Sequence, residues 1–96
     1  MLFDPKWQVK TPVQQALLDA ADLLEREGWI RHQFKSDEGY CMIGAIAEST
    51  ACGPDYQDAV TKIMKLIGGG SLPSWNDRPG RTKEEVVTML RAAALS

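Results

Sequence analysis

The sequence contains few of the residue types that mark a metal site or a binder of phosphate backbones. One histidine and two cysteines occur in 96 residues, too few for the side chains of a structural zinc site. Basic residues number 11 against 13 acidic ones, which gives a net charge of −2. A general nucleic-acid binder needs a basic excess to release counterions, and no dinucleotide or phosphate-loop fingerprint occurs. We therefore expect no metal, no cofactor and no general affinity for nucleic acid.

Long apolar segments are missing as well. The sequence has no run of about 18 apolar residues, the minimum that suggests a membrane span. The first residues, MLFDPKWQVK, lack the apolar stretch of a signal peptide. We expect a cytoplasmic protein that does not contact the membrane.

The two cysteines, Cys41 and Cys52, are expected to be reduced. If they share one helix, their Cα atoms lie roughly 16 Å apart at 1.5 Å per residue. A disulfide needs less than about 7 Å. Reduced and mostly buried thiols are the prediction, as is usual for cytosolic proteins.

Periodicity predicts an all-α fold, a compact four-helix domain. Thr11 with Gln14 and Thr82 with Glu85 form capping boxes that start the first and last helices. The second helix is apolar nearly all round and is therefore expected at the centre of the domain. The expected helices cover residues 12–27, 40–51, 54–67 and 82–95. Together residues 11–96 are predicted to form a single helical domain.

Three segments lie outside the expected helices. Residues 1–10 are predicted to form an N-terminal arm, apolar enough through Leu2, Phe3 and Trp7 to lie on the domain or on a partner. Residues 29–39 are predicted to be a loop with some strand character. Residues 68–81 are predicted to be a structured loop, in which Asn76 and Asp77 make an Asx turn and residues 78–81 a type II turn.

One set of residue types permits catalysis. Cys41, near the start of the second helix, is a candidate nucleophile because a helix N-terminus lowers a thiol pKa. A nucleophilic cysteine also needs a base and a group that orients it, and His32 and Asp77 are the candidates. The competing interpretation is that Cys41 is a small buried residue, with a raised pKa and no reactivity.

The aromatic and basic residues permit two further roles. Trp29 and Trp75 are predicted to fill the core, whereas Trp7 could equally contact a partner. A nucleic-acid-binding alternative would use four basic residues. These are Arg31, Lys35, Arg78 and Arg81.

Several short motifs occur in a fixed order. They are Gly28-Trp29, then Cys41-x-x-Gly44-Ala45-Ile46, then Trp75-Asn76-Asp77, and finally Thr82-x-x-Glu85-Val86. In this order the chain resembles a family of small uncharacterised bacterial and phage proteins, over roughly residues 12–94. The resemblance implies a domain of unknown function and assigns no catalytic residue; His32 is not part of the pattern.

Taken together, the sequence predicts a non-enzymatic helical module that binds another protein or a second copy of itself. The resemblance to phage proteins adds the expectation of a regulatory partner in the host. The residues expected to carry interaction or structure are Trp7, Trp29, Trp75, Asn76 and Asp77.

Overall fold

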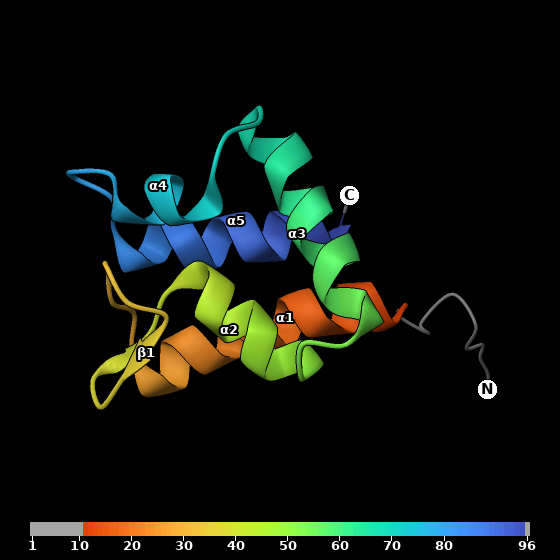
Figure 1. Cartoon of the computed structure of the whole chain (residues 1–96), viewed down its shortest axis with the longest axis horizontal. Coiled ribbons are helices and arrows are strands. Elements are labelled where there is room, and N and C mark those ends of the chain that lie inside the picture. The colour runs from red at the N-terminus through yellow and green to blue at the C-terminus, as the bar shows by residue number, and fades with distance from the viewer. Residues whose placement is uncertain (1–10, 96) are drawn as a thin grey trace.

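A computed structural model describes residues 11–95 of the chain, which contain five helices and one two-stranded sheet (Figure 1). The predicted arm, with Trp7, lies outside these residues. The elements in chain order are α1 (Pro12–Glu27), β1 (Lys35–Ser36), β2 (Gly39–Tyr40), α2 (Met42–Thr50), α3 (Pro54–Ile67), α4 (Leu72–Asp77) and α5 (Lys83–Leu95).

Both predicted capping boxes are present. The Gln14 backbone N–H donates to Thr11 Oγ1 at 3.1 Å, and the Thr11 N–H donates to Gln14 Oε1 at 2.9 Å. The same reciprocal pair joins Thr82 and Glu85 at the start of α5, at 3.0 and 3.2 Å. These bonds satisfy helix-terminal amides that have no partner within the helix, so the first and last helices begin where the sequence predicts.

The core lies between α1, α5 and α2. The helices α1 and α5 share the most extensive contact, α2 packs on α1, and α3 crosses the end of the layer (Figure 1). Leu17, Leu24, Ile46 and Leu90 are fully buried, and each burial contributes about 1.5–3 kcal/mol. None of the helices in the described part of the chain combines the length and apolar character needed to span a bilayer.

The predicted count of four helices is incomplete, because residues 68–81 contain the short helix α4. Ser71 caps it by accepting the Ser74 N–H at 3.2 Å, and Pro73 stands in its first turn, where the missing N–H costs nothing. The predicted turn after it is present: the Arg81 N–H donates to the Arg78 carbonyl at 3.0 Å, and Gly80 has φ 85°.

The second helix begins two residues later than predicted, and the all-α description omits a small sheet. Tyr40 lies in β2, where its N–H donates to the Gly28 carbonyl at 3.1 Å and its carbonyl accepts from Ile30 at 3.0 Å. Strands β1 and β2 pair antiparallel. These bonds hold Tyr40 extended, and Cys41 becomes the cap of α2.

Gly44, in the first turn of α2, allows the hairpin to pack directly against the helix. A Cβ added at Gly44 would overlap with the carbonyl oxygen of Phe34. The same carbonyl accepts the Cys41 N–H at 3.1 Å. Only glycine leaves room for this approach, so Gly44 fixes the path of the chain at Phe34.

We predict that Gly44→Ala lowers the free energy of unfolding by about 1–3 kcal/mol, the usual cost of forcing extra volume into a packed site. Urea denaturation measures this. Gly53→Ala is the control, because its added Cβ would meet only the Thr50 carbonyl oxygen, at 3.2 Å. Equal losses in the two variants would contradict the assigned role of Gly44.

Candidate functional site

Asn76, near the end of α4, is the one polar side chain in the core formed by residues 11–95, with 1% of its surface exposed. Its Oδ1 accepts the indole N–H of Trp29 at 2.6 Å and the backbone N–H of Met42 at 3.0 Å. Its Nδ2 donates to the Ile30 carbonyl at 3.1 Å and to Asp77 Oδ1 at 3.0 Å. A primary amide offers two acceptor and two donor positions, and all four are occupied.

These bonds correct the prediction of an Asx turn at Asn76-Asp77. Asn76 bonds the segment after α1 and the start of α2, and Asp77 bonds the backbone of His32. Apart from the bond between the two side chains, their partners lie 34 to 47 positions earlier in the chain. The two residues therefore join distant segments and do not shape their own turn.

Asp77 holds His32 in an unusual backbone conformation. His32 has φ 69°, a left-handed geometry that costs a non-glycine residue roughly 1–2 kcal/mol. Its N–H donates to Asp77 Oδ1 at 2.9 Å, and its Nδ1 lies 3.4 Å from Asp77 Oδ2. The hydrogen bond from Asn76, then that from the His32 backbone, and the charges of His32 and Arg31 lower the pKa of Asp77 below its ordinary 3.8. The carboxylate is therefore ionised at neutral pH.

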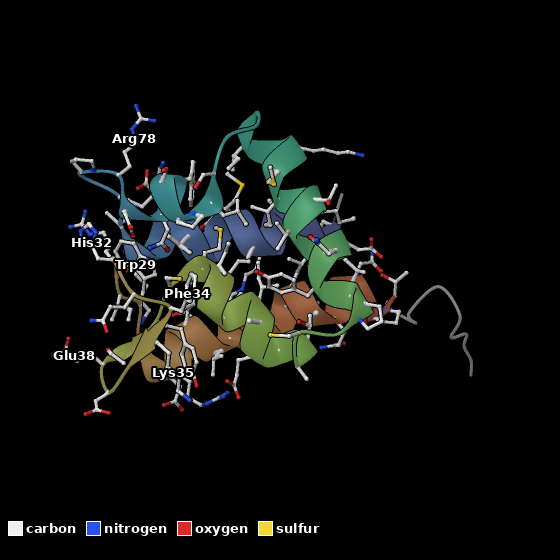
Figure 2. The ribbon with its side chains drawn as sticks, in the orientation of Figure 1. Trp29, His32, Phe34, Lys35, Glu38 and Arg78 are labelled. Atoms are coloured by element: carbon white, nitrogen blue, oxygen red, sulfur yellow. The ribbon has the colours of Figure 1, made fainter. Side chains whose placement is uncertain are left out.

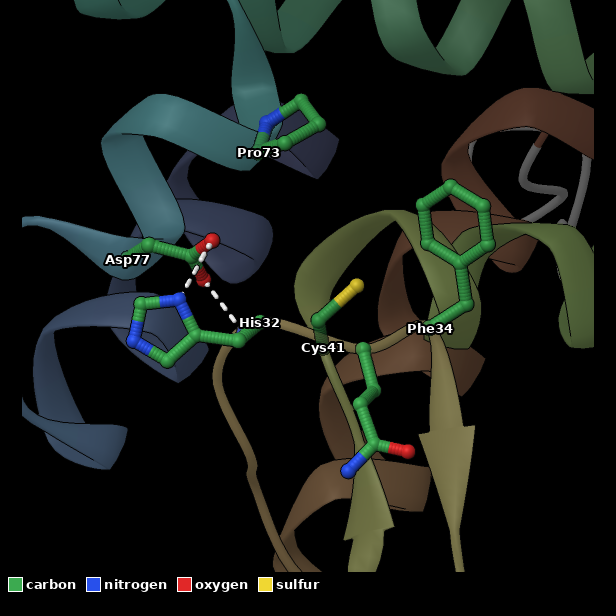
Figure 3. A pocket seen from close by; sticks show the side chains of 6 residues that line it. His32, Phe34, Cys41, Pro73 and Asp77 are labelled. Atoms are coloured by element: carbon green, nitrogen blue, oxygen red, sulfur yellow. Dashed lines mark hydrogen bonds and ion pairs between the residues drawn. The ribbon is translucent and has the colours of Figure 1, made fainter.

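A pocket of about 290 Å³ opens between the hairpin, the start of α2 and α4 (Figure 3). We call it the Asp77 pocket. It is lined by His32, Gln33, Phe34, Cys41, Pro73 and Asp77. Figure 3 shows the Asp77 carboxylate and the Cys41 sulfur facing the space below Pro73, with the Phe34 ring at the opposite edge. Sequence reasoning named Cys41, His32 and Asp77 together, and the structure brings all three to this pocket.

Cys41 acts as the cap of α2. Its Sγ accepts the Gly44 N–H at 3.3 Å, and the residue is 4% exposed. Burial raises the pKa of the Cys41 thiol, and the negative charge of Asp77 raises it further. The backbone N–H groups of Gly44 and Ile43 lower this pKa, but by less than burial raises it. The thiol is therefore protonated at neutral pH.

The geometry lacks the contact that would activate this thiol. Within residues 11–95, no hydrogen bond joins Cys41 to His32, and Figure 3 shows the second imidazole nitrogen directed away from the sulfur. His32 is 75% exposed and paired with Asp77. A nucleophilic cysteine needs its base within hydrogen-bond reach.

In residues 11–95, no three His, Cys, Asp or Glu side chains are grouped so as to hold a metal ion.

Trp29 and Trp75 are half-buried and pack against the core. Each also has a cation above its ring: the Arg31 guanidinium carbon lies 5.8 Å from the Trp29 centroid, and that of Arg81 lies 3.6 Å from the Trp75 centroid. Arg81 Nε donates to the Trp75 carbonyl at 2.9 Å. The stacked Arg81 thus joins the end of α4 to the turn before α5.

The four basic residues of the nucleic-acid alternative do not form one patch. Arg31 donates to the Arg78 carbonyl at 3.2 Å, Lys35 lies 5.4 Å over the Tyr40 ring, and Arg81 is stacked on Trp75. Figure 2 shows the Arg78 side chain pointing away from the domain, far from Lys35. Lys35 is thus separated from Arg78, and the side chains of Arg31, Lys35 and Arg81 contact groups of the domain itself.

Sequence reasoning did not select Phe34 or Pro73, which form the apolar part of the Asp77 pocket. Phe34 is 62% exposed. One signal was available: Ile30, His32 and Phe34 alternate with more polar neighbours, which is typical of an extended segment with two faces. For α4 the signal was Ser71 before Leu72-Pro73, a capping residue followed by a proline that fits a first turn.

These features define a class of protein: a small helical domain in which a buried asparagine, bonded to a half-buried tryptophan and an aspartate, joins α4 to the segment after α1 and to the start of α2. The chain belongs to a family of unknown function, DUF6197, whose model matches residues 8–95. This agrees with the resemblance drawn from the ordered motifs. The comparison with curated proteins found no match, and neither did the comparison with solved structures.

We predict that Asn76→Ala lowers the free energy of unfolding by at least about 3 kcal/mol. The Trp29 indole N–H, the Met42 N–H and the Ile30 carbonyl all lose a partner, and each buried unpaired group costs about 1–3 kcal/mol. Chemical denaturation measures the loss. Ser74→Ala, an exposed position of α4, is the control and should change stability by less than about 0.5 kcal/mol.

We predict that the two thiols react at very different rates. Cys52 is exposed and Cys41 is buried, and burial disfavours the reactive thiolate. Native labelling at neutral pH with a thiol reagent should be at least about tenfold slower for Cys52→Ser, which retains Cys41, than for Cys41→Ser. In denaturant the two variants should react alike. Fast labelling of Cys41 in the folded protein would instead favour a nucleophile.

Proposed function

We propose that the protein is a non-enzymatic interaction module that binds another protein through the surface around Phe34. The observation that carries this proposal is an exposed phenylalanine held on a rigid backbone between two hollows. Aromatic side chains beside pockets are frequent anchors of protein interfaces. Phe34 is exposed and does not pack into the core of its own domain, so its ring is free to contact a partner.

The surface extends on both sides of Phe34. The Asp77 pocket lies on one side. A second hollow of about 420 Å³ lies along α2 on the other, and its walls include Tyr40, Ala47, Glu48 and Ala51. Phe34 lines both hollows, so a bound chain could contact the ring while occupying either side.

The backbone at Phe34 supports the proposal because its position is fixed before binding. The Phe34 carbonyl accepts from Cys41 at 3.1 Å and lies against Gly44, and His32 is held by Asp77. Association costs less when the contact residues are already ordered. The hydrogen-bond network of Asn76 therefore serves this surface as well as the fold.

We also propose a cellular compartment and a class of partner. Both cysteines are free, which is typical of a reducing compartment such as the cytoplasm. The resemblance to bacterial and phage proteins supports a regulatory partner in a bacterial host. A second copy of the chain is the other partner that this surface could accept.

A cysteine-dependent enzyme is the second candidate, because Cys41, His32 and Asp77 line one pocket. The raised pKa of Cys41 and the orientation of His32 weigh against it. The rates of thiol labelling described above distinguish the two candidates.

We predict that Phe34→Ser loses most partner binding while remaining folded. Phe34 is largely exposed, so its unfolding free energy should change by less than about 0.5 kcal/mol. The measurement is quantitative capture of bacterial lysate proteins on immobilised protein, together with light scattering for self-association. Leu66→Ser, an exposed apolar residue on α3, is the matched control. Capture that is absent, or equally reduced in both variants, would contradict the proposed surface.

A further inference from the structure

We propose that the Asp77 pocket binds an arginine side chain of the partner protein, with the guanidinium on the Asp77 carboxylate and the aliphatic stem against Phe34, Pro73 and Cys41. This inference rests on the proposed function and specifies the chemistry that the surface selects.

Among residues 11–95, the Asp77 carboxylate is the only ionised acceptor that lines the pocket. Asp77 Oδ1 already accepts from the His32 backbone at 2.9 Å and from Asn76 at 3.0 Å. Oδ2 has only the long contact of 3.4 Å to His32 Nδ1. The Asp77 side chain is 25% exposed, and Figure 3 shows its oxygens facing the open space. One charged acceptor is therefore available to a cation from outside.

The nearby guanidinium groups of the chain do not occupy this position, and its one neighbour is the His32 imidazole at 3.4 Å. Arg31 donates to the Arg78 carbonyl and lies over the Trp29 ring. Figure 2 shows Arg78 projecting away from the domain. The Asp77 carboxylate is therefore not bonded to the guanidinium of Arg31 or Arg78, and it can accept a cation from a partner.

The other walls suit an arginine stem and guanidinium plane. Phe34 and Pro73 are apolar, and the Cys41 thiol is uncharged. Arginine buries its methylene groups along apolar surface while its head stays polar, and a guanidinium stacks favourably on an aromatic face. An anionic ligand would face Asp77 directly, and a purely apolar one would cover an ionised carboxylate at a cost.

The volume is sufficient for one side chain. The pocket holds about 290 Å³, which is at the small end of the roughly 300–1,000 Å³ of ligand sites. A single side chain on a peptide backbone that continues across Phe34 fits this space.

The test uses two dipeptide probes, N-acetyl-leucyl-arginine amide and N-acetyl-leucyl-citrulline amide, which have nearly the same shape but differ in charge. Each is titrated into ¹⁵N-labelled protein at neutral pH. We expect the arginine probe to shift the amide signals of His32, Phe34 and Asp77, and to bind roughly two- to fivefold more tightly than the citrulline probe, as one exposed charge pair permits. Asp77→Asn keeps an acceptor for the His32 N–H and should remove this preference. Leu66→Ser should retain it.

Equal binding of both probes to the wild-type protein, or shifts confined to residues outside the pocket, would overturn the inference. That comparison does not depend on whether Asp77→Asn folds. The capture experiment separates the two proposals: if Phe34→Ser loses the partner and Asp77→Asn retains it, the arginine site is wrong while the interaction surface stands. If Phe34→Ser keeps its partner, the proposed function itself fails.

Discussion

The side-chain amide of Asn76 is the constraint on which this end of the domain depends. An amide buried without partners costs several kcal/mol, and Asn76 avoids this through four hydrogen bonds to Trp29, Ile30, Met42 and Asp77. The two-residue strands and the short helix α4 are too short to be stable alone. Asn76 and Asp77 bond α4 to Ile30, His32 and Met42, which flank the hairpin on both sides, and these tertiary contacts hold the short elements together.

The ordered motifs of the sequence describe this single junction. Gly28 lies so close to the Glu38 carbonyl that a side chain would overlap with it, and Gly44 has the same relation to Phe34. Cys41 caps α2 through the Gly44 N–H. Trp29 and Asn76 meet directly at 2.6 Å. Residues that are far apart in the sequence are therefore parts of one tertiary contact.

Local signals predicted the fold where local interactions decide it. The capping boxes and apolar stripes gave α1, α3 and α5 nearly to the residue, and Pro79-Gly80 gave the turn before α5. The hairpin and α4 were missed or only suggested, since their stability comes from Asn76 and from contacts across the chain. For the site, residue chemistry was enough to group Cys41, His32 and Asp77. It could not select Phe34 or Pro73, because exposure and proximity arise only after folding.

Asp77 connects stability and recognition because its two oxygens face different surroundings. Oδ1 accepts from Asn76 and from the strained backbone of His32, so it belongs to the internal network. Oδ2 has one long contact, to an imidazole that is itself mostly exposed. Two residues further along the chain, the Cys41 N–H and the close approach of Gly44 fix the backbone of Phe34. A surface assembled this way presents a charge and an aromatic ring in fixed relative positions, which favours selection of a partner by chemistry and geometry together.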